Sequence, residues 1–155
     1  MVSLSTFFER KGVPVKKRPY PAGSRIFSQA DLANEIYFLE SGQVNITKKA
    51  LLGQKEINLA TLGPGDFFGV LSFTSGSTRL ADATALTDCT LWEIDKKAFE
   101  EALDISPEFS MFFISDLAKR LESLNKRMLE ISDGLREFTR RIEDLSTLWQ
   151  SLIPM

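Results

Sequence analysis

Apolar residues recur at alternating steps of four and three along the C-terminal third of the chain. Eleven residues, called the seam below, follow this pattern without a break: Leu117, Leu121, Leu124, Met128, Ile131, Leu135, Phe138, Ile142, Leu145, Trp149 and Leu152. A mean step of 3.5 residues is typical of a coiled coil and not of a helix packed on a sheet. Unbroken, the seam would be about 50 Å long, which is longer than one small domain can cover.

The seam predicts a parallel homodimer in which the corresponding helix of a second chain covers it. Ser106-Pro107-Glu108 supplies a helix start, with a capping hydroxyl, a proline at the first helical position and an acid in the first turn. The alternative is a tail that folds back at Ser132-Asp133-Gly134. Gly134 lies outside the seam and costs a helix only about 1 kcal/mol, which favours the homodimer. Since no proline follows Pro107 until Pro154, we expect one long helix or two helices hinged once. Antiparallel and higher-order assemblies remain open.

Composition limits the class of protein. The 155 residues are 43% hydrophobic and 26% charged, which is ordinary for one soluble globular domain. A net charge of -2 gives no reason to expect nucleic acid or an anionic membrane as partner. No apolar run approaches the roughly 18 residues of a membrane span, and charges at Glu9, Arg10 and Lys11 oppose a signal peptide. These features predict a cytoplasmic protein.

The absence of histidine excludes many catalytic and metal-binding chemistries. Without it the chain has no Ser-His-Asp or Cys-His nucleophile, no His-rich zinc site and no His-ligated haem. The single cysteine, Cys89, closes no intrachain disulfide, and its apolar surroundings predict an inert core thiol. Asp66 and Asp82 are the acids near the motif described below, but no activated nucleophile accompanies them. We therefore expect neither an enzyme nor a resident cofactor or metal.

Short strands separated by turns precede the long helix. The expected strands are 13–20, 25–27, 35–39, 43–48, 56–62 and two within 82–94, with a polar hairpin around Gly53-Gln54. Turn signals about every ten residues are typical of an all-β sandwich or barrel. An amphipathic helix over 3–11 and a helix capped by Asp95 flank these strands. The sequence thus predicts two parts: residues 1-105, a β-roll with an N-terminal helix, and residues 106-155, a long dimerisation helix.

The stretch from Gly63 to Ala85 has the residues needed to hold one phosphate. Gly69 follows two phenylalanines and precedes a short apolar turn, and Arg79 follows a Gly/Ser/Thr loop. Glycine lets backbone amides approach a ligand, a helix start directs N-H groups outward, and arginine adds a permanent charge with a flat donor fork. The alternation of Ala81, Ala83 and Ala85 either leaves room for a ligand or relieves crowding in a narrow barrel.

These residues resemble the phosphate-binding cassette of the cyclic-nucleotide-binding domain family of the catabolite-activator type. The matching residues are Phe68-Gly69-Val70-Leu71, then Arg79-Leu80-Ala81 and Ala85. The resemblance covers about 15–135 and implies an antiparallel jelly roll flanked by short helices, with a long helix that dimerises and closes the pocket. It implies phosphate-cassette contacts at six residues: Gly69, Val70, Leu71, Arg79, Leu80 and Ala81. It also implies base contacts at Leu124 and Asn125.

One departure from the family pattern concerns the ribose. Val70 stands where the family has a glutamate that accepts hydrogen bonds from the 2'-hydroxyl. Its loss is expected to cost roughly 1 to 3 kcal/mol, or one to two orders of magnitude in affinity. The resemblance therefore implies weakened binding of cyclic AMP or cyclic GMP, and an organic acid without a ribose hydroxyl would suit Val70 better.

Two functions remain open on sequence. The first is a stand-alone signal-sensing domain that binds a small anion at Arg79 and signals through the dimer helix to an unknown protein partner. The second is a dimerisation or adaptor scaffold that binds nothing, with Arg79 either neutralised by Asp82 or Asp66 or turned into solvent. Direct DNA binding is not expected, because about 20 residues follow Gly134 and they continue the heptad repeat without a recognition helix or basic stripe.

Overall fold

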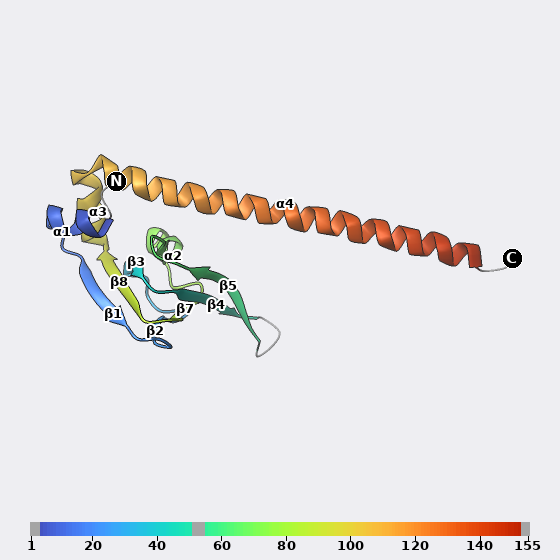
Figure 1. Cartoon of the computed structure of the whole chain (residues 1–155), viewed down its shortest axis with the longest axis horizontal. Coiled ribbons are helices and arrows are strands. Elements are labelled where there is room, and N and C mark those ends of the chain that lie inside the picture. Colours follow the sequence, from blue (N-terminus) through green and yellow to red (C-terminus); the bar gives the residue numbers. More distant parts are fainter. Residues whose placement is uncertain (1–3, 51–54, 153–155) are drawn as a thin grey trace. The chain divides into compact units, whose positions relative to one another are not determined.

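The computed structural model describes residues 4–50 and 55–152 (Figure 1). The hairpin expected around Gly53-Gln54 lies outside the described residues. The chain divides into two compact units, residues 1–112 and 113–155, which are described in turn.

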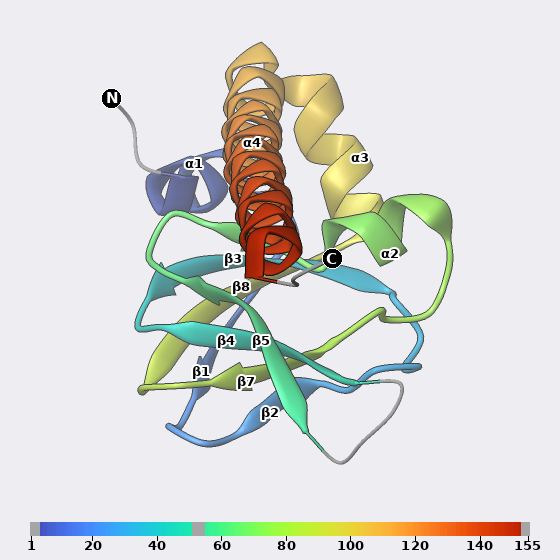
Figure 2. The same cartoon turned by 90° about the vertical axis from the view of Figure 1, so that its right-hand side faces the viewer.

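Two four-stranded antiparallel sheets form the first unit (Figure 2). One has the order β1-β8-β3-β6, made of Lys16–Tyr20, Cys89–Asp95, Glu35–Ser41 and Phe67–Phe68. The other has the order β2-β7-β4-β5, made of Arg25–Phe27, Asp82–Ala85, Val44–Lys49 and Glu56–Leu62. The predicted antiparallel β roll is confirmed, and the two-residue strand β6 is the one described strand that the sequence did not indicate.

The core of the roll is filled by side chains from both sheets. Leu39 and Leu91 from the first sheet and Val44 and Ala83 from the second are fully buried. Ala83 and Ala85 belong to the same hydrophobic cluster as Phe27, Tyr37 and Phe68. At these two alanines the small side chains therefore accommodate bulky neighbours and do not leave space inside the roll.

Gly42 and Cys89 fix the turn between β3 and β4 against β8. Gly42 has φ +90°, a conformation that favours glycine, and a Cβ added there would lie 2.7 Å from the Cys89 sulfur. The Cys89 thiol is buried and donates to the Gln43 carbonyl at 3.1 Å. The expectation of a core thiol is confirmed.

Short helices flank the roll, as expected. Helix α1, Leu4–Lys11, buries Leu4, Phe7 and Phe8, and the Phe7 ring stacks on Phe109 with centroids 5.6 Å apart. Helix α3, Lys96–Ile105, begins at the predicted cap, where the Asp95 carboxylate accepts from the Ala98 N-H at 2.8 Å.

Helix α4 runs unbroken from Pro107 to Leu152 and starts where the Ser106 hydroxyl accepts from the Phe109 N-H at 3.2 Å. Its first residues belong to the first unit, and the remainder forms the second. Gly134 does not interrupt it, so one continuous helix is found and not two. The eleven seam residues are between 38% and 74% exposed. Among the described helices, none is long and apolar enough to span a membrane.

Candidate functional site

The cassette begins where strand β6 passes into helix α2, Val70–Ser75. Gly69 is the N-cap of this helix at φ +76°, and Gly76 is its C-cap at φ +66°. Both are left-handed conformations that glycine adopts without strain, which explains why so short a helix has sharp ends. Val70, its first residue, is buried.

Arg79 is the centre of the site. It is only 2% exposed, and its guanidinium donates from Nη1 to the Gly69 carbonyl at 2.9 Å and from Nη2 to the Glu35 carbonyl at 2.6 Å. A Cβ on residue 69 would lie 2.5 Å from Nη1. Glycine is therefore needed at position 69 for two reasons: the backbone has a positive φ, and Arg79 approaches too closely for a Cβ.

The charge on Arg79 is only partly balanced by neighbouring groups. The nearest carboxylate oxygen, on Glu35, lies 3.9 Å from Nη2, and the ring of Phe27 lies 4.3 Å from the guanidinium carbon. Nε is buried without a hydrogen-bond partner among the described residues. Burial lowers the pKa of Arg79, because the charged form loses its hydration, while Tyr37 and Glu35 oppose this shift. A buried cation with an unused donor is suited to accept an anion.

The two acids considered as internal partners of Arg79 in the scaffold alternative make other contacts in the structure. Asp82 pairs with Arg25 at 2.8 Å and accepts from the Gln29 N-H at 2.7 Å. Asp66 accepts from the Gly63 N-H at 2.9 Å. The carboxylate that lies nearest to Arg79 among the described residues is instead that of Glu35, because β3 begins beside the cassette.

The loop after β2 holds the backbone of Arg79 in place. Ala30 N-H donates to the Arg79 carbonyl at 2.9 Å, and Arg79 N-H donates to the Asp31 carbonyl at 2.8 Å. Leu32 and Thr78 form an isolated antiparallel bridge beside them. The sequence did not indicate that this loop belongs to the site. The one available signal was Ala30, which stands where the family that the sequence resembles usually has glycine.

The structure brings the six predicted cassette residues together on consecutive segments. Gly69, Val70 and Leu71 form the start of α2, and Arg79, Leu80 and Ala81 form the segment that leads into β7. Leu71 and Leu80 are 74% and 55% exposed, whereas Arg79 is buried. Leu124 and Asn125 are exposed residues of the second unit, and their role as base contacts stays a prediction.

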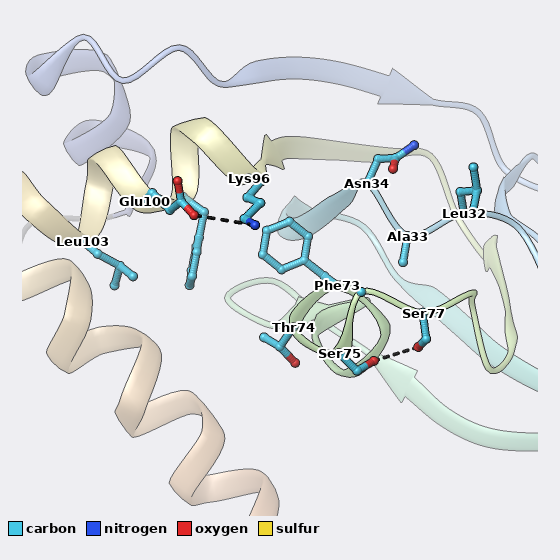
Figure 3. A pocket seen from close by; sticks show the side chains of 12 residues that line it. Leu32, Ala33, Asn34, Phe73, Thr74, Ser75, Ser77, Lys96, Glu100 and Leu103 are labelled. Carbon is cyan, nitrogen blue, oxygen red and sulfur yellow. Dashed lines mark hydrogen bonds and ion pairs between the residues drawn. The ribbon is translucent and has the colours of Figure 1, made fainter.

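A separate pocket of about 660 Å³ lies on the other half of α2 (Figure 3). Its lining includes Phe73–Ser77 and, from α3, Lys96, Phe99, Glu100 and Leu103. The Ser75 and Ser77 hydroxyls hydrogen-bond to each other at 2.7 Å (Figure 3). None of the six cassette residues is among its described lining residues. The Phe73 and Phe99 rings meet edge to face with centroids 5.6 Å apart, which links α2 to α3.

The class of protein is thus a small antiparallel β-roll domain in which a glycine-capped helix lies beside a buried arginine. The model of the cyclic nucleotide-binding domain matches residues 17–106, which is more than half of the chain, and the chain belongs to this family.

Curated relatives and solved structures agree with this membership. The cAMP-activated global transcriptional regulator CRP of Haemophilus influenzae is 32% identical over 114 residues, which cover 73% of this chain and 50% of the relative. The catabolite activator protein of Thermus thermophilus is 31% identical with a TM-score of 0.66, covering 76% of this chain and 55% of that one. The c-di-GMP responsive global regulator CLP of Xanthomonas campestris is 25% identical with a TM-score of 0.67, covering 79% and 61%. The chain spans about half the length of the curated relatives it matches.

Proposed function

We propose that this chain is a regulatory domain that senses a small anionic ligand at Arg79 and signals through a dimer formed by α4. The observation that carries the proposal is the Arg79 guanidinium, which is buried beside the start of α2. Among the residues that the structure describes, its Nε has no hydrogen-bond partner and no carboxylate is closer to the guanidinium than 3.9 Å. The relatives are regulators by their names, and this supports a regulatory rather than a catalytic role.

The proposed mechanism follows from the bonds that Arg79 makes now. An anion that accepts from Nη1 competes with the Gly69 carbonyl, which is held at 2.9 Å. Since Gly69 is the N-cap of α2, release of this bond frees the cassette to shift. The first N-H groups of a helix lack partners within it, so those of α2 are candidates to bind the same anion. A shift becomes a signal when the ligand binds one arrangement more tightly than the other.

Cyclic AMP and cyclic GMP are the first ligands to test. One relative is described as cAMP-activated and one solved structure as c-di-GMP responsive, so related domains respond to different nucleotides. Val70 offers no acceptor to a ribose hydroxyl, so we expect weaker binding than in a domain with a carboxylate there. An organic acid without that hydroxyl is the second ligand class.

The test is calorimetric titration of the full chain with each cyclic nucleotide. We expect micromolar to millimolar binding that Arg79→Met abolishes, because methionine keeps much of the volume but removes the charge and the donors. Circular dichroism and the oligomeric state of the variant establish that it is folded. Absence of heat at millimolar nucleotide with a folded wild-type dimer would remove cyclic nucleotides from the proposal.

Val70→Glu tests the ribose contact directly. We expect it to tighten cyclic AMP binding by about one to two orders of magnitude, because the carboxylate gains the 2'-hydroxyl as a donor. The gain should vanish with 2'-deoxy cyclic AMP, which wild type should bind as well as cyclic AMP. Leu86→Glu is the matched control, since it adds the same charge at an exposed position outside the six cassette residues. Equal gains in both variants would contradict the assignment of Val70.

The second candidate function is a dimerisation scaffold that binds no ligand. It is favoured by the two carbonyl bonds that already occupy Nη1 and Nη2 of Arg79. A scaffold predicts that neither cyclic nucleotides nor organic acids change the melting temperature, while Arg79→Met lowers it through loss of these bonds.

A further inference from the structure

We propose that the pocket between α2 and α3 is a second ligand site, which binds a small zwitterion with an aromatic side chain, that is, an aromatic amino acid. The pocket lies within the first unit, at the end of α2 that is away from Gly69. The inference does not depend on a ligand at Arg79, because the pocket lining, so far as the structure describes it, includes none of the six cassette residues.

The pocket has the size and the apolar floor of a small-molecule site. Its volume of about 660 Å³ lies within the roughly 300 to 1,000 Å³ that is usual for such sites. The Phe73 ring points from α2 toward α3 (Figure 3), and it meets Phe99 with ring centroids 5.6 Å apart. Phe73, Phe99 and Leu103 are only half-buried, and Leu32 adds an exposed apolar side chain to the lining. An aromatic ring bound on this floor removes apolar surface from water on both sides of the contact.

A cation and a carboxylate stand together at the rim of the pocket. Lys96 Nζ lies 4.0 Å from the Glu100 carboxylate, and the two side chains are 80% and 62% exposed (Figure 3). Exposed pairs of this kind contribute little to stability. The order along the helix is also the less favourable one, since a glutamate is better placed four residues before a lysine than after it. Both groups are therefore available to a ligand at little cost.

Helix α3 begins with cations, where a helix favours anions. Lys96 and Lys97 are its first two residues, and its first turn contains no acid. The preceding Asp95 carboxylate caps the helix and accepts from the Ala98 N-H at 2.8 Å. Lysine at this end is unfavourable, because the backbone N-H groups already make the end positive. A ligand carboxylate held by Lys96 reduces this repulsion, which favours an anionic group at this end of the pocket.

Floor and rim together define a ligand with three parts. Its carboxylate accepts from Lys96, its ammonium group donates to Glu100, and its aromatic ring lies on Phe73 and Phe99. An amino acid carries both charged groups on one carbon atom, which matches a cation and a carboxylate only 4.0 Å apart. A ligand with a carboxylate alone is repelled by Glu100, and a ligand with an amine alone is repelled by Lys96.

Calorimetric titration of the full chain with L-phenylalanine tests the site. We expect a dissociation constant between about 10 µM and 1 mM, which is ordinary for a ligand of about a dozen non-hydrogen atoms. Three comparison compounds each lack one part: 3-phenylpropionate lacks the ammonium group, phenethylamine lacks the carboxylate, and L-alanine lacks the ring. We expect each of them to bind at least about tenfold more weakly.

Substitutions at the rim assign each charged group of the ligand to its partner. Lys96→Met should raise the dissociation constant of L-phenylalanine about tenfold and leave phenethylamine binding unchanged or tighter. Glu100→Gln should weaken L-phenylalanine by a similar factor and strengthen 3-phenylpropionate, because it removes the repulsion of the carboxylate. Lys97→Met and Glu101→Gln, at exposed neighbours outside the described lining, are the charge-matched controls and should bind like wild type. Circular dichroism establishes that each variant is folded.

The outcomes distinguish this site from the cassette. Binding of L-phenylalanine that both rim variants weaken and both controls retain supports the inference, whatever Arg79→Met does to cyclic nucleotides. Binding that a folded Arg79→Met variant loses and Lys96→Met retains would place the amino acid at the cassette and overturn the inference. Equal weakening by Lys96→Met and Lys97→Met would indicate attraction without a site and would overturn it too. Absence of L-phenylalanine binding at about 10 mM ligand would have the same consequence.

Discussion

Ala30 carries backbone strain next to the cassette. It is the one described residue other than glycine with a positive φ, at 74°. This conformation costs a side-chain-bearing residue roughly 1 to 2 kcal/mol relative to glycine. The bond from its N-H to the Arg79 carbonyl and the neighbouring bond from Arg79 to Asp31 hold it there. The strain is thus maintained by the contacts that position Arg79.

We expect Ala30→Gly to raise the free energy of unfolding by about 0.5 to 1 kcal/mol, since relief of strain exceeds the added entropy of the unfolded chain. Urea denaturation measures the change. Ala33→Gly, in the same loop without a positive φ, is the control and should not stabilise. A lower midpoint for Ala30→Gly would show that the strain at residue 30 is absent.

Tyr37 makes the stability of the roll sensitive to alkali. Burial and the neighbouring Glu35 charge raise the pKa of Tyr37 to about 12, while Arg79 opposes the shift. The folded pKa lies above the unfolded value of about 10, so its contribution is complete below pH 10 and is lost as pH rises through 12. The pKa of Tyr20 is raised in the same direction by burial and by its bond to Glu93.

Tyr37→Phe removes the ionisable group and should reduce this alkaline loss. We expect the variant to lose less stability than wild type between pH 9 and 12, by up to about 2 kcal/mol. Urea midpoints followed by far-ultraviolet circular dichroism at several pH values give the comparison. Parallel curves for the two proteins would mean that Tyr37 does not ionise in this range.

The importance of Arg79 was predictable, but the identity of its neighbours was not. The spacing of Gly69 and Arg79 and the resemblance of both segments to a known cassette locate the arginine. Its contact with Glu35 depends on where β3 starts relative to the loop after β2, which long-range strand pairing decides. Asp82 was a reasonable partner by sequence distance, but it pairs with Arg25 at 2.8 Å instead.

Gly134 is the weak point of helix α4. It sits in the helix interior, and a Cβ added there would meet nothing within 4 Å. Glycine in a helix interior costs about 1 kcal/mol relative to alanine. We expect Gly134→Ala to raise the melting temperature of α4. The ellipticity at 222 nm, recorded as a function of temperature, measures it. Ser132→Ala, two residues earlier on the same helix, is the control and should give a smaller rise. An unchanged or lower melting temperature for Gly134→Ala would contradict this account.

Helices whose starts are marked by nearby capping residues were predicted more accurately than strands that form only by pairing with distant residues. The capping side chains Asp95 and Ser106 mark the starts of α3 and α4, because a cap depends on residues within one turn. Strand β6, Phe67–Phe68, has no such signal, since its two residues become a strand only by pairing with Tyr37 and Phe38.

At the scale of the whole molecule, the proposed dimerisation would link stability to protein concentration. If folding of α4 requires a second copy, the folded dimer is favoured by mass action. We expect the melting temperature of the full chain to rise by a few degrees between micromolar and hundred-micromolar protein. Ile131→Asp places a charge at the centre of the seam and should abolish this dependence. A concentration-independent wild-type transition would argue for a monomeric helix.

Because Gly42 packs against Cys89, the reactivity of the Cys89 thiol reports local opening of the roll. With no room for even one added carbon beside the sulfur, an alkylating reagent reaches the thiol only when the turn between β3 and β4 separates from β8. The labelling rate of native protein therefore measures how often this part of the roll opens. Because the chain has one cysteine, the measurement needs no engineered label, and a ligand that tightens the roll would slow the reaction without touching the sulfur.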